Sequence, residues 1–376
     1  MTGRNVLVVG GGIGGLSAAI ALRQAGLAVT VLERQHDLHS SIFGVGIIQP
    51  INALRALDAL GCAQACMDAG YPASEWGAMY DVDGNHLHPM RGTPIEGSDL
   101  PPLNGLTRPK LHEILTDRTQ EVGAQIRYNS TFSELQPDAD GVTVVYPDGT
   151  TERFDYVVGA DGVYSQVRRY VLDETLAPRY IGQSAYRLNM PRLPEIDRII
   201  LQKGPKGMAG FVPIGPELAY FFYNTDMPKQ ERSQVECREQ LREHLAPFGG
   251  LTGRVRDEFL TEDTEIVLRP EESLISPAPW HRGRIVLMGD AVHAITPHLG
   301  QGAAQAIEDG VVLGEVLAKY DDAEQAFAEF TERRYERCKL IVETSLAIGE
   351  WEMGRLPDFD NIAATNHVLE VMAQPL

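Results

Sequence analysis

Cysteine and long apolar runs are both scarce in this sequence. Only four of the 376 residues are cysteine, no two of them form a CxxC pair, and only Cys62 and Cys66 are close enough to be neighbours on a helix. We therefore expect free thiols rather than a disulfide framework or a thiolate metal site. No stretch reaches the ~18 uninterrupted apolar residues of a membrane span, and the N-terminus lacks the pattern of a secretory signal. A cytoplasmic protein without a membrane partner is expected.

Positive charge is also in short supply. Lys and Arg total 33 against 52 Asp and Glu, which gives a formal net charge of -19 at pH 7. Such a field repels phosphate backbones and anionic lipid head groups, so nucleic acid is excluded as a main partner. An anionic substrate would need a local arginine or lysine. His86 and His88 share a strand face, but no third ligand is evident nearby, so no metal is expected.

What the sequence does contain is the alternation of an α/β protein. An apolar run ending at Val9 leads through a glycine cluster into helical spacing, and a second apolar run covers Ala28 to Leu32. Further helices are predicted at 51–60, 108–122, 230–245, 301–320 and 324–351. Hairpins are predicted around Asp83-Gly84 and Asp148-Gly149, and the chain from 185 to 268 is mostly strand-like. Gly204, Gly207 and Gly210 are interpreted as turn positions.

These elements predict two domains. The chain enters the first domain, leaves it twice for a mostly antiparallel sheet, and returns at about Arg284. The first domain comprises 1–70, 102–180 and 276–376, including the C-terminal helices. The second comprises 71–101 and 181–275.

The glycine cluster has the spacing of a dinucleotide-binding fingerprint. Gly10-x-Gly12-x-x-Gly15, with Ile13 and Gly14 inside it, follows a strand and opens a helix. Its glycines permit a tight turn, the approach of a pyrophosphate and close helix packing. Glu33, followed by Arg34, ends the next strand and can accept hydrogen bonds from a ribose diol. The fingerprint indicates a Rossmann-like domain, but NAD and FAD share this adenosine end, so it leaves both open.

Two later motifs separate these cofactors. Gly159-Ala160-Asp161-Gly162 and Met288-Gly289-Asp290 each place an acid at a strand end, and Arg108-x-x-Leu111 lies on a helix between the fingerprint and the first of them. Together with the segment from Pro297 to Gly302, these motifs resemble those of the single-component FAD-dependent aromatic hydroxylases, the salicylate and 4-hydroxybenzoate hydroxylase type. The resemblance covers essentially the whole chain. It implies a Rossmann-like FAD-binding domain with an inserted, mostly antiparallel β-sheet substrate domain and a C-terminal helix.

The resemblance also implies cofactor roles and a reaction. Asp290 is expected to bond the ribitol of FAD, Arg108 to approach its phosphate side, and Asp161 to support the pyrophosphate and nicotinamide region. NADH or NADPH would bind transiently and reduce the flavin. Oxygen would then form a flavin C4a-hydroperoxide that hydroxylates a phenolic or heteroaromatic small molecule. A monomer or homodimer is expected.

Backbone chemistry around Pro297 agrees with this interpretation. The glycines after Pro297 lead into a predicted helix, whose positive N-terminal end favours the negative charge of a reduced flavin. Gly300, Gly302 and Ala303 are the candidate donors. His293 lies in the turn beside Asp290, and we interpret it as a packing residue rather than a catalytic one.

The substrate wall is expected to come from the antiparallel domain and Pro297. Its candidates are Tyr186, Arg187, Tyr220 and Phe222. Tyr220 and Phe222 share one strand face, and the Tyr220 phenol is a candidate for bonding a substrate phenolate. Arg187 is a candidate for holding an acidic substituent. The alternative is that the aromatics are sheet core and Arg187 is a surface ion pair.

Other functions remain open at this point. The same fold is compatible with an FAD-dependent epoxidase or another oxidoreductase, or with a non-catalytic flavin or ligand-binding protein. Halogenation is disfavoured because Trp76, Trp280 and Trp351 are isolated from one another. The Asp290 motif disfavours an NAD-dependent dehydrogenase.

Overall fold

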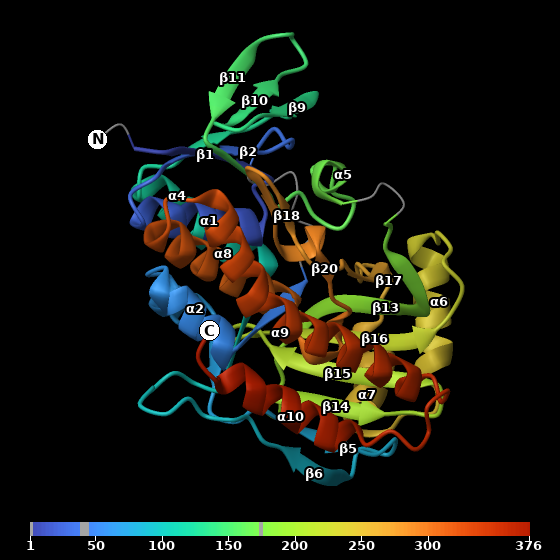
Figure 1. The fold of residues 1–376 in the computed structure, drawn as a ribbon. Coiled ribbons are helices and arrows are strands. Elements are labelled where there is room, and N and C mark those ends of the chain that lie inside the picture. The colour runs from blue at the N-terminus through green and yellow to red at the C-terminus, as the bar shows by residue number, and fades with distance from the viewer. Residues whose placement is uncertain (1–2, 38–44, 173–175) are drawn as a thin grey trace.

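A six-stranded, mainly parallel sheet organises one half of the molecule. The computed structural model describes residues 3–37, 45–172 and 176–376 (Figure 1). The strand order is β18-β19-β12-β1-β2-β8. β1 (Asn5–Val9) pairs in parallel with both β2 (Ala28–Leu32) and β12 (Tyr156–Gly159). The other strands are β8 (Gln125–Arg127), β18 (His281–Arg282) and β19 (Ile285–Leu287).

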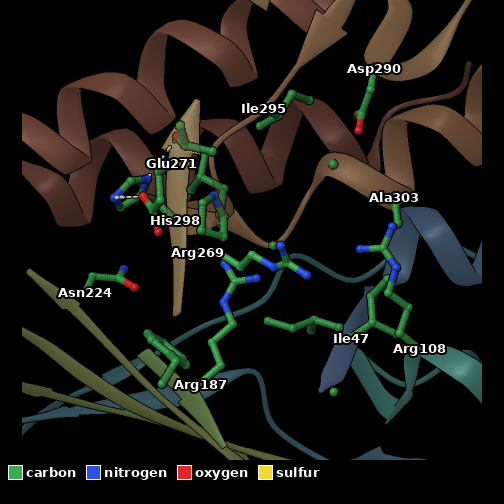
Figure 2. Close-up of a pocket in the computed structure, with 18 of the residues that line it drawn as sticks. Ile47, Arg108, Arg187, Asn224, Arg269, Glu271, Asp290, Ile295, His298 and Ala303 are labelled. Atoms are coloured by element: carbon green, nitrogen blue, oxygen red, sulfur yellow. Dashed lines mark hydrogen bonds and ion pairs between the residues drawn. The ribbon is translucent and has the colours of Figure 1, made fainter. Parts of the chain in front are cut away.

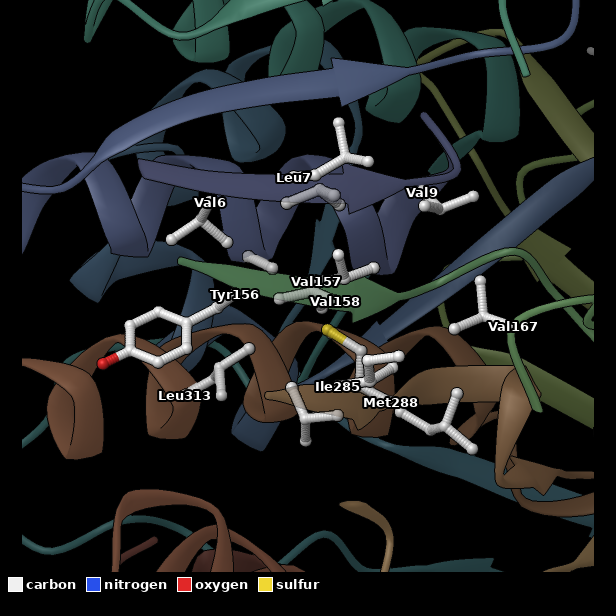
Figure 3. Close-up of a cluster of buried hydrophobic side chains, with 14 of the residues drawn as sticks. Val6, Leu7, Val9, Tyr156, Val157, Val158, Val167, Ile285, Met288 and Leu313 are labelled. Carbon is white, nitrogen blue, oxygen red and sulfur yellow. The ribbon is translucent and has the colours of Figure 1, made fainter. Parts of the chain in front are cut away.

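Helices on this sheet complete the first core. Figure 3 shows Val6, Val158 and Ile285 packed toward Leu313 of α8 (Gly302–Lys319). α1 (Ile13–Gln24) lies against α8 so closely that a Cβ at Gly310 would come within 2.7 Å of the Ser17 carbonyl carbon. This contact ties the glycine-rich turn at the start of the chain to the helix that follows Pro297. α2 (Ile51–Ala59), α3 (Ala63–Ala69) and α4 (Arg108–Glu121) pack beside them.

An eight-stranded, mainly antiparallel sheet forms the other half. Its order is β20-β17-β13-β16-β15-β14-β5-β6. Side chains of α6 (Gln234–Leu245) join the core on one face of this sheet. The strands are β5 (Gly77–Tyr80), β6 (His86–Met90), β13 (Arg179–Pro191), β14 (Ile199–Lys203), β15 (Gly207–Pro213), β16 (Leu218–Asp226), β17 (Val267–Ile275) and β20 (His293–Ala294).

The C-terminal helices connect the two halves. α9 (Ala323–Glu352) contacts α8 as well as β13, β17 and β20, and it crosses the middle of the view in Figure 1. α10 (Asn361–Ala373) packs on α9 and α2. Two small sheets complete the fold: β9 (Glu134–Pro137), β10 (Val142–Val145) and β11 (Thr151–Phe154), and β3 (Gly46–Pro50), β7 (Leu103–Thr107) and β4 (Tyr71–Ala73).

The predicted elements correspond closely to these bounds, and the mixed α/β class is confirmed. The four cysteines are buried free thiols. The interpretation of Gly207 and Gly210 as turns is wrong, because both lie inside β15. A Cβ at Gly210 would lie 2.1 Å from a Phe222 ring carbon, so glycine there makes room for a neighbouring side chain. Among the described helices, none combines the length and apolarity needed to cross a membrane.

Candidate active site

The glycine-rich turn between β1 and α1 brings backbone groups into very close contact. Gly10 has φ +107°, and a Cβ there would lie 2.4 Å from the Ala160 carbonyl oxygen. A Cβ at Gly15 would lie 1.9 Å from the Gly10 oxygen. Gly12, at the N-cap of α1, has open space where its Cβ would be. Only glycine satisfies the first two positions, and the third leaves the start of α1 open to a ligand.

Two carboxylates organise loops beside this turn. Glu33 accepts hydrogen bonds from the amides of Gly11 and Gln35, both at 2.8 Å. Asp161 accepts from Ser165 Oγ at 2.5 Å and from the Gln166 amide at 2.6 Å. Asp161 therefore holds the loop that follows β12. Both residues and Arg34 line a cavity of about 260 Å³ at the carboxyl ends of the parallel strands.

The Gly289-Asp290 turn presents a carboxyl group to a second, larger cavity. Gly289 has φ +59°, and its amide donates to Asp309 Oδ2 at 2.8 Å. The Asp290 side chain is exposed to the cavity. Desolvation by the surrounding cavity walls raises the pKa of Asp290, although His293 and Arg108 oppose the shift.

The start of α8 lies against the same cavity. A short turn over Pro297–Leu299 ends at Gly300, which has φ +63° and lies against Ile48. Gln301 occupies the N-cap of α8, but its side chain bonds to Asn52 instead of capping the helix. The first amides of α8, at Gly302 and Ala303, therefore begin a helix whose positive end faces the cavity lining.

The larger cavity has a volume of about 480 Å³ and runs from Asp290 to the face of the eight-stranded sheet. It adjoins the smaller cavity, because both are lined by Gly12, Ile13, Arg108, Ala160 and Gly162. The structure thus brings the fingerprint, Asp161, Asp290 and the α8 N-terminus around one continuous space. Figure 2 shows Asp290, Ala303 and Arg108 at one end of it and Asn224 and Glu271 at the other.

Strand alternation decides which sheet residues reach this space. Tyr220, Phe222 and Asn224 of β16 line the cavity, and Arg187 of β13 pairs directly with Phe222. Of the predicted substrate residues, the structure brings Tyr220, Phe222, Arg187 and Pro297 to the cavity. The alternative that Arg187 is a surface ion pair does not hold in the described residues, where it has no salt bridge and its buried Nε has no hydrogen-bond partner.

Tyr186 is the exception, and its prediction as a cavity residue is wrong. It precedes Arg187 in β13, so it points to the opposite face of the sheet. There it is fully buried in the core beside α6, and its hydroxyl donates to Gln240 Oε1 at 3.1 Å. Burial raises its pKa to about 12.

Three guanidinium groups face the cavity. Arg108 and Arg187 are joined there by Arg269 of β17, and Figure 2 shows Arg187 and Arg269 pointing into the space between the two ends. Within the described ranges none of the three makes a salt bridge. Burial lowers the pKa of Arg108, and Asp290 opposes that shift. The overall charge of the chain is -19. These three arginines therefore supply the local positive charge that an anionic ligand needs.

A polar cluster closes the end of the cavity that lies away from Asp290. His298 Nε2 lies 2.7 Å from Gln183 Oε1, 3.6 Å from Glu271 Oε2 and 3.5 Å from Glu352 Oε2. Burial raises the pKa of Glu271 to about 8 and that of Glu352 to about 7, and it lowers the pKa of His298 to about 3. The cluster therefore contains two carboxyl groups able to exchange protons near neutral pH.

The sequence of the chain matches a known family along most of its length. A sequence profile described as "FAD binding domain" matches residues 4–345.

The chain belongs to the FAD binding domain family.

Two relatives and one solved structure show how far this similarity extends. The chain is 32% identical over 354 residues to 2-heptyl-3-hydroxy-4(1H)-quinolone synthase of Pseudomonas aeruginosa, covering 92% of this chain and 90% of that protein. It is 30% identical over 346 residues to the FAD-dependent urate hydroxylase of Klebsiella pneumoniae, covering 89% and 87%. The crystal structure of a single-residue variant of Klebsiella pneumoniae HpxO complexed with FAD superposes with a TM-score of 0.83 at 25% identity, over 98% and 94% of the two chains.

These findings confirm the prediction that the chain is a single-component FAD-dependent monooxygenase of the aromatic hydroxylase family, with FAD as its cofactor. The residues of this family member also fit that cofactor. The turn around Gly10 and Gly15 leaves no room for side chains, and the Asp290 carboxyl and the uncapped start of α8 open onto one space. Arg108 makes no salt bridge among the described residues, and its positive charge in the lining of both cavities suits the phosphate side of a dinucleotide.

Sequence reasoning missed the polar end of the cavity in this FAD-binding chain. Arg269 and Glu271 alternate in β17, which is the signal that places both on one sheet face. Asn224 follows the same rule from Phe222 in β16. His298 and Glu352 carry no such signal. Glu352 reaches the cavity because α9 packs against the sheet, and His298 reaches it because the Pro297–Leu299 turn packs against α9.

Proposed function

We propose that the chain is an FAD-dependent monooxygenase that uses NADH or NADPH and O2 to hydroxylate a phenolic or nitrogen-containing aromatic ring. The observation that carries this proposal is the continuity of the larger cavity. It joins the Asp290 turn and the α8 N-terminus to a wall of two aromatic rings and two arginines. A ring held on that wall would lie beside the cofactor in a space shielded by protein.

The cofactor would extend along both cavities. The fingerprint residues Gly10, Gly12, Ile13, Gly14 and Gly15 would hold its pyrophosphate side, Glu33 and Arg34 its adenosine ribose, and Arg108 and Asp161 the region between. Asp290 would bond the ribitol. Bound FAD supplies the capacity to accept a hydride from a nicotinamide and to activate oxygen for transfer.

The N-terminal end of α8 would stabilise the negative charge of the reduced cofactor. Amides at Gly300, Gly302 and Ala303 lie at the positive end of an 18-residue helix. Such an end stabilises an adjacent negative charge without reorganisation, which favours an anionic reduced ring.

The sheet would orient the substrate. The Tyr220 and Phe222 rings lie with centroids 5.6 Å apart and offer an apolar surface against which an aromatic ring can pack. Burial raises the pKa of Tyr220, so its phenol stays protonated and can donate a hydrogen bond to a substrate oxygen. Arg187, opposite Phe222, would hold an acidic substituent, and Pro297 would close the side near α8.

Relatives support a heteroaromatic substrate. Two of them are named for a quinolone and for urate, which are both nitrogen-containing rings bearing oxygen. We propose further that 1–70, 102–180 and 276–376 act as the FAD-binding domain and 71–101 with 181–275 as the substrate domain, in a monomer or homodimer.

One experiment tests the reaction. The purified protein is reconstituted with FAD, and NADH or NADPH oxidation and oxygen uptake are followed with a panel of phenols, quinolones and urate. Substrate-stimulated oxygen uptake with a product heavier by one oxygen atom, confirmed with 18O2, supports hydroxylation. Epoxide products would replace hydroxylation with epoxidation, and bound flavin with no oxygen uptake in the presence of any ligand would favour a binding protein.

A further inference from the structure

Glu271 is a carboxyl group that the protein buries and leaves unbonded. Its side chain is about 1% exposed, yet both carboxylate oxygens lack a hydrogen-bond partner among the described residues. It lies on the cavity wall in β17, two residues after Arg269. A buried carboxyl group without a partner is costly, and such groups persist where a ligand supplies the missing bonds.

Both ring nitrogens of the neighbouring His298 have hydrogen-bond partners other than Glu271. Gln183 Nε2 donates to Glu352 at 2.8 Å, which turns the Gln183 carbonyl oxygen toward His298 Nε2 at 2.7 Å. His298 therefore donates its Nε2 hydrogen to Gln183, and Nδ1 accepts from Thr296 Oγ1 at 2.9 Å. Both ring nitrogens are satisfied in the neutral imidazole. His298 thus completes the cluster without bonding Glu271.

Two unpaired donors flank Glu271 on the same sheet face. Arg187 Nε is buried without an acceptor, and Arg269 makes no salt bridge in the described part of the chain. The charge of Arg187 acts on Glu271, but the two side chains are not within ion-pair distance. Space for a ligand therefore separates a carboxyl group from two guanidinium groups, as Figure 2 shows.

We propose that Glu271 contacts the substrate and accepts a proton from a ring N–H or O–H, while Arg187 and Arg269 hold the conjugated ring oxygen. This inference rests on the proposed hydroxylation and specifies its substrate class: an aromatic ring with an acidic N–H or O–H conjugated to a second oxygen. The Glu271 O–H bond forms as the ring N–H or O–H bond breaks. The electron pair stays on the ring, where its charge spreads to the oxygen between the guanidinium groups and makes the ring a better nucleophile.

The pH dependence of substrate activation follows from the groups around Glu271. Arg187, Arg269, Tyr220, His298 and Glu352 face it from five elements. Burial raises its pKa to about 8, Glu352 adds to the shift, and Arg187 opposes it. The carboxylate that accepts the proton therefore becomes more abundant as pH rises through about 8, and kcat/KM should rise with it.

The test uses the FAD-loaded protein and two probe rings, 4-quinolone and its N-methyl derivative. The variants are Glu271→Gln, Glu352→Gln and, as a matched control, the exposed Glu265→Gln. For each protein we would measure the Kd of both rings by perturbation of flavin absorbance, FAD retention, and kcat/KM from pH 6 to 9.5. Glu271→Gln keeps the shape of the side chain but cannot accept the proton.

The expected result is specific to one ring and one variant. Wild type should bind 4-quinolone about tenfold more tightly than the N-methyl ring, because a hydrogen bond to a charged group is lost on methylation. Glu271→Gln should weaken this preference, because its amide oxygen accepts only a neutral hydrogen bond from the ring N–H. It should also flatten the kcat/KM rise near pH 8, because an amide takes up no proton, while FAD is retained. Glu265→Gln should keep both features. Glu352→Gln should keep the preference for 4-quinolone and move the kcat/KM rise to lower pH, because Glu352 contributes to the raised pKa of Glu271.

Several outcomes would overturn the inference. They are an unchanged preference in Glu271→Gln, a pH limb that disappears in Glu352→Gln instead, or wild-type protein that binds neither ring. If wild type turns over the rings and Glu271→Gln behaves identically, only the Glu271 inference fails. If wild type retains FAD but shows no oxygen uptake with any substrate in the wider panel, the proposed function itself fails.

Discussion

Nε2 of His293 lies 2.6 Å from Oδ2 of Asp309, and the same carboxylate oxygen accepts the Gly289 amide at 2.8 Å. The other oxygen of Asp309 accepts from Arg334 Nε at 2.7 Å. One buried carboxylate on α8 therefore fixes the turn that presents Asp290 to the cavity. His293 is fully buried, and its ring is held by this bond to Asp309.

We predict that Asp309→Asn destabilises the fold and loosens the Asp290 turn. The amide cannot accept from all three donors, and it leaves the buried Arg334 charge less compensated. Removing one partner of a buried ion pair costs about 3 kcal/mol. Urea unfolding would measure the loss, with the exposed Asp58→Asn as the control. Equal stability of the two variants would show that the network is dispensable.

The Asp309 carboxylate should also make the free energy of unfolding depend on pH in the acidic range. Burial acts to raise the pKa of Asp309, but His293 and Arg334 outweigh it and lower the pKa to about 2. A lowered folded-state pKa contributes stability that is present above about pH 4 and is lost as pH falls toward 2. The contribution is about 2 kcal/mol. The free energy of unfolding should therefore fall less between pH 5 and 2 in Asp309→Asn than in wild type; parallel curves would argue against this linkage.

Replacing Asp290 by alanine should weaken FAD retention without unfolding the protein. The side chain is exposed to the cavity, so its removal leaves no void in a hydrophobic core. Loss of hydrogen bonds to a charged group predicts roughly 10- to 100-fold weaker FAD binding. Flavin content after gel filtration and fluorescence titration with FAD would measure it. Wild-type affinity in the variant would contradict the ribitol role.

Two tyrosine variants should have opposite effects. Tyr186→Phe removes a hydroxyl that donates to Gln240 behind the sheet, so it should cost about 1 kcal/mol of stability and leave KM unchanged. Tyr220→Phe removes a hydroxyl from the cavity wall, so it should leave stability nearly unchanged and raise KM or lower kcat. Thermal melts and steady-state kinetics on both variants would distinguish the two faces. A changed KM in Tyr186→Phe would contradict this assignment, because it would show that a residue on the core face of the sheet affects substrate binding in the cavity.

Gly210→Ala should narrow the cavity without affecting the cofactor. The new methyl group would lie 2.1 Å from the Phe222 ring, which must move into the cavity. Overpacking of this kind costs about 1–3 kcal/mol of folding stability. The displaced ring also takes space from a bound substrate, so KM should rise about tenfold while FAD content stays constant. Gly215→Ala is the matched control, since its Cβ would meet only Leu218 at 3.8 Å. Equal KM values for the two variants would show that Phe222 does not set the cavity width.

Local patterns in the sequence were enough to predict most of the fold. β1, α1 and β2 follow from apolar spacing and the glycine cluster, and α9 follows from its apolar stripe. Asp161 and Asp290 follow β12 and β19, which run in parallel, so both lie at one carboxyl edge of the sheet.

The rest depends on contacts between distant segments. Alternation alone would have separated Tyr186 from Arg187, but the role of Gly210 depends on the Phe222 ring in the next strand. Glu271, His298 and Glu352 come from β17, the turn after Pro297 and the end of α9. No local periodicity links these three segments, so the polar end of the cavity emerges only from the folded chain.

Helix α10 lies beside the larger cavity, far along the chain from the residues expected to hold the cofactor. Asn361 and Thr365 of α10 line the larger cavity, and Arg55 and Arg337 bond the carbonyl oxygens at the end of that helix. Helix α10 therefore forms part of the wall of the larger cavity. Replacements confined to these few turns would change which molecules are admitted while every residue of the fingerprint and the Asp290 turn stays intact.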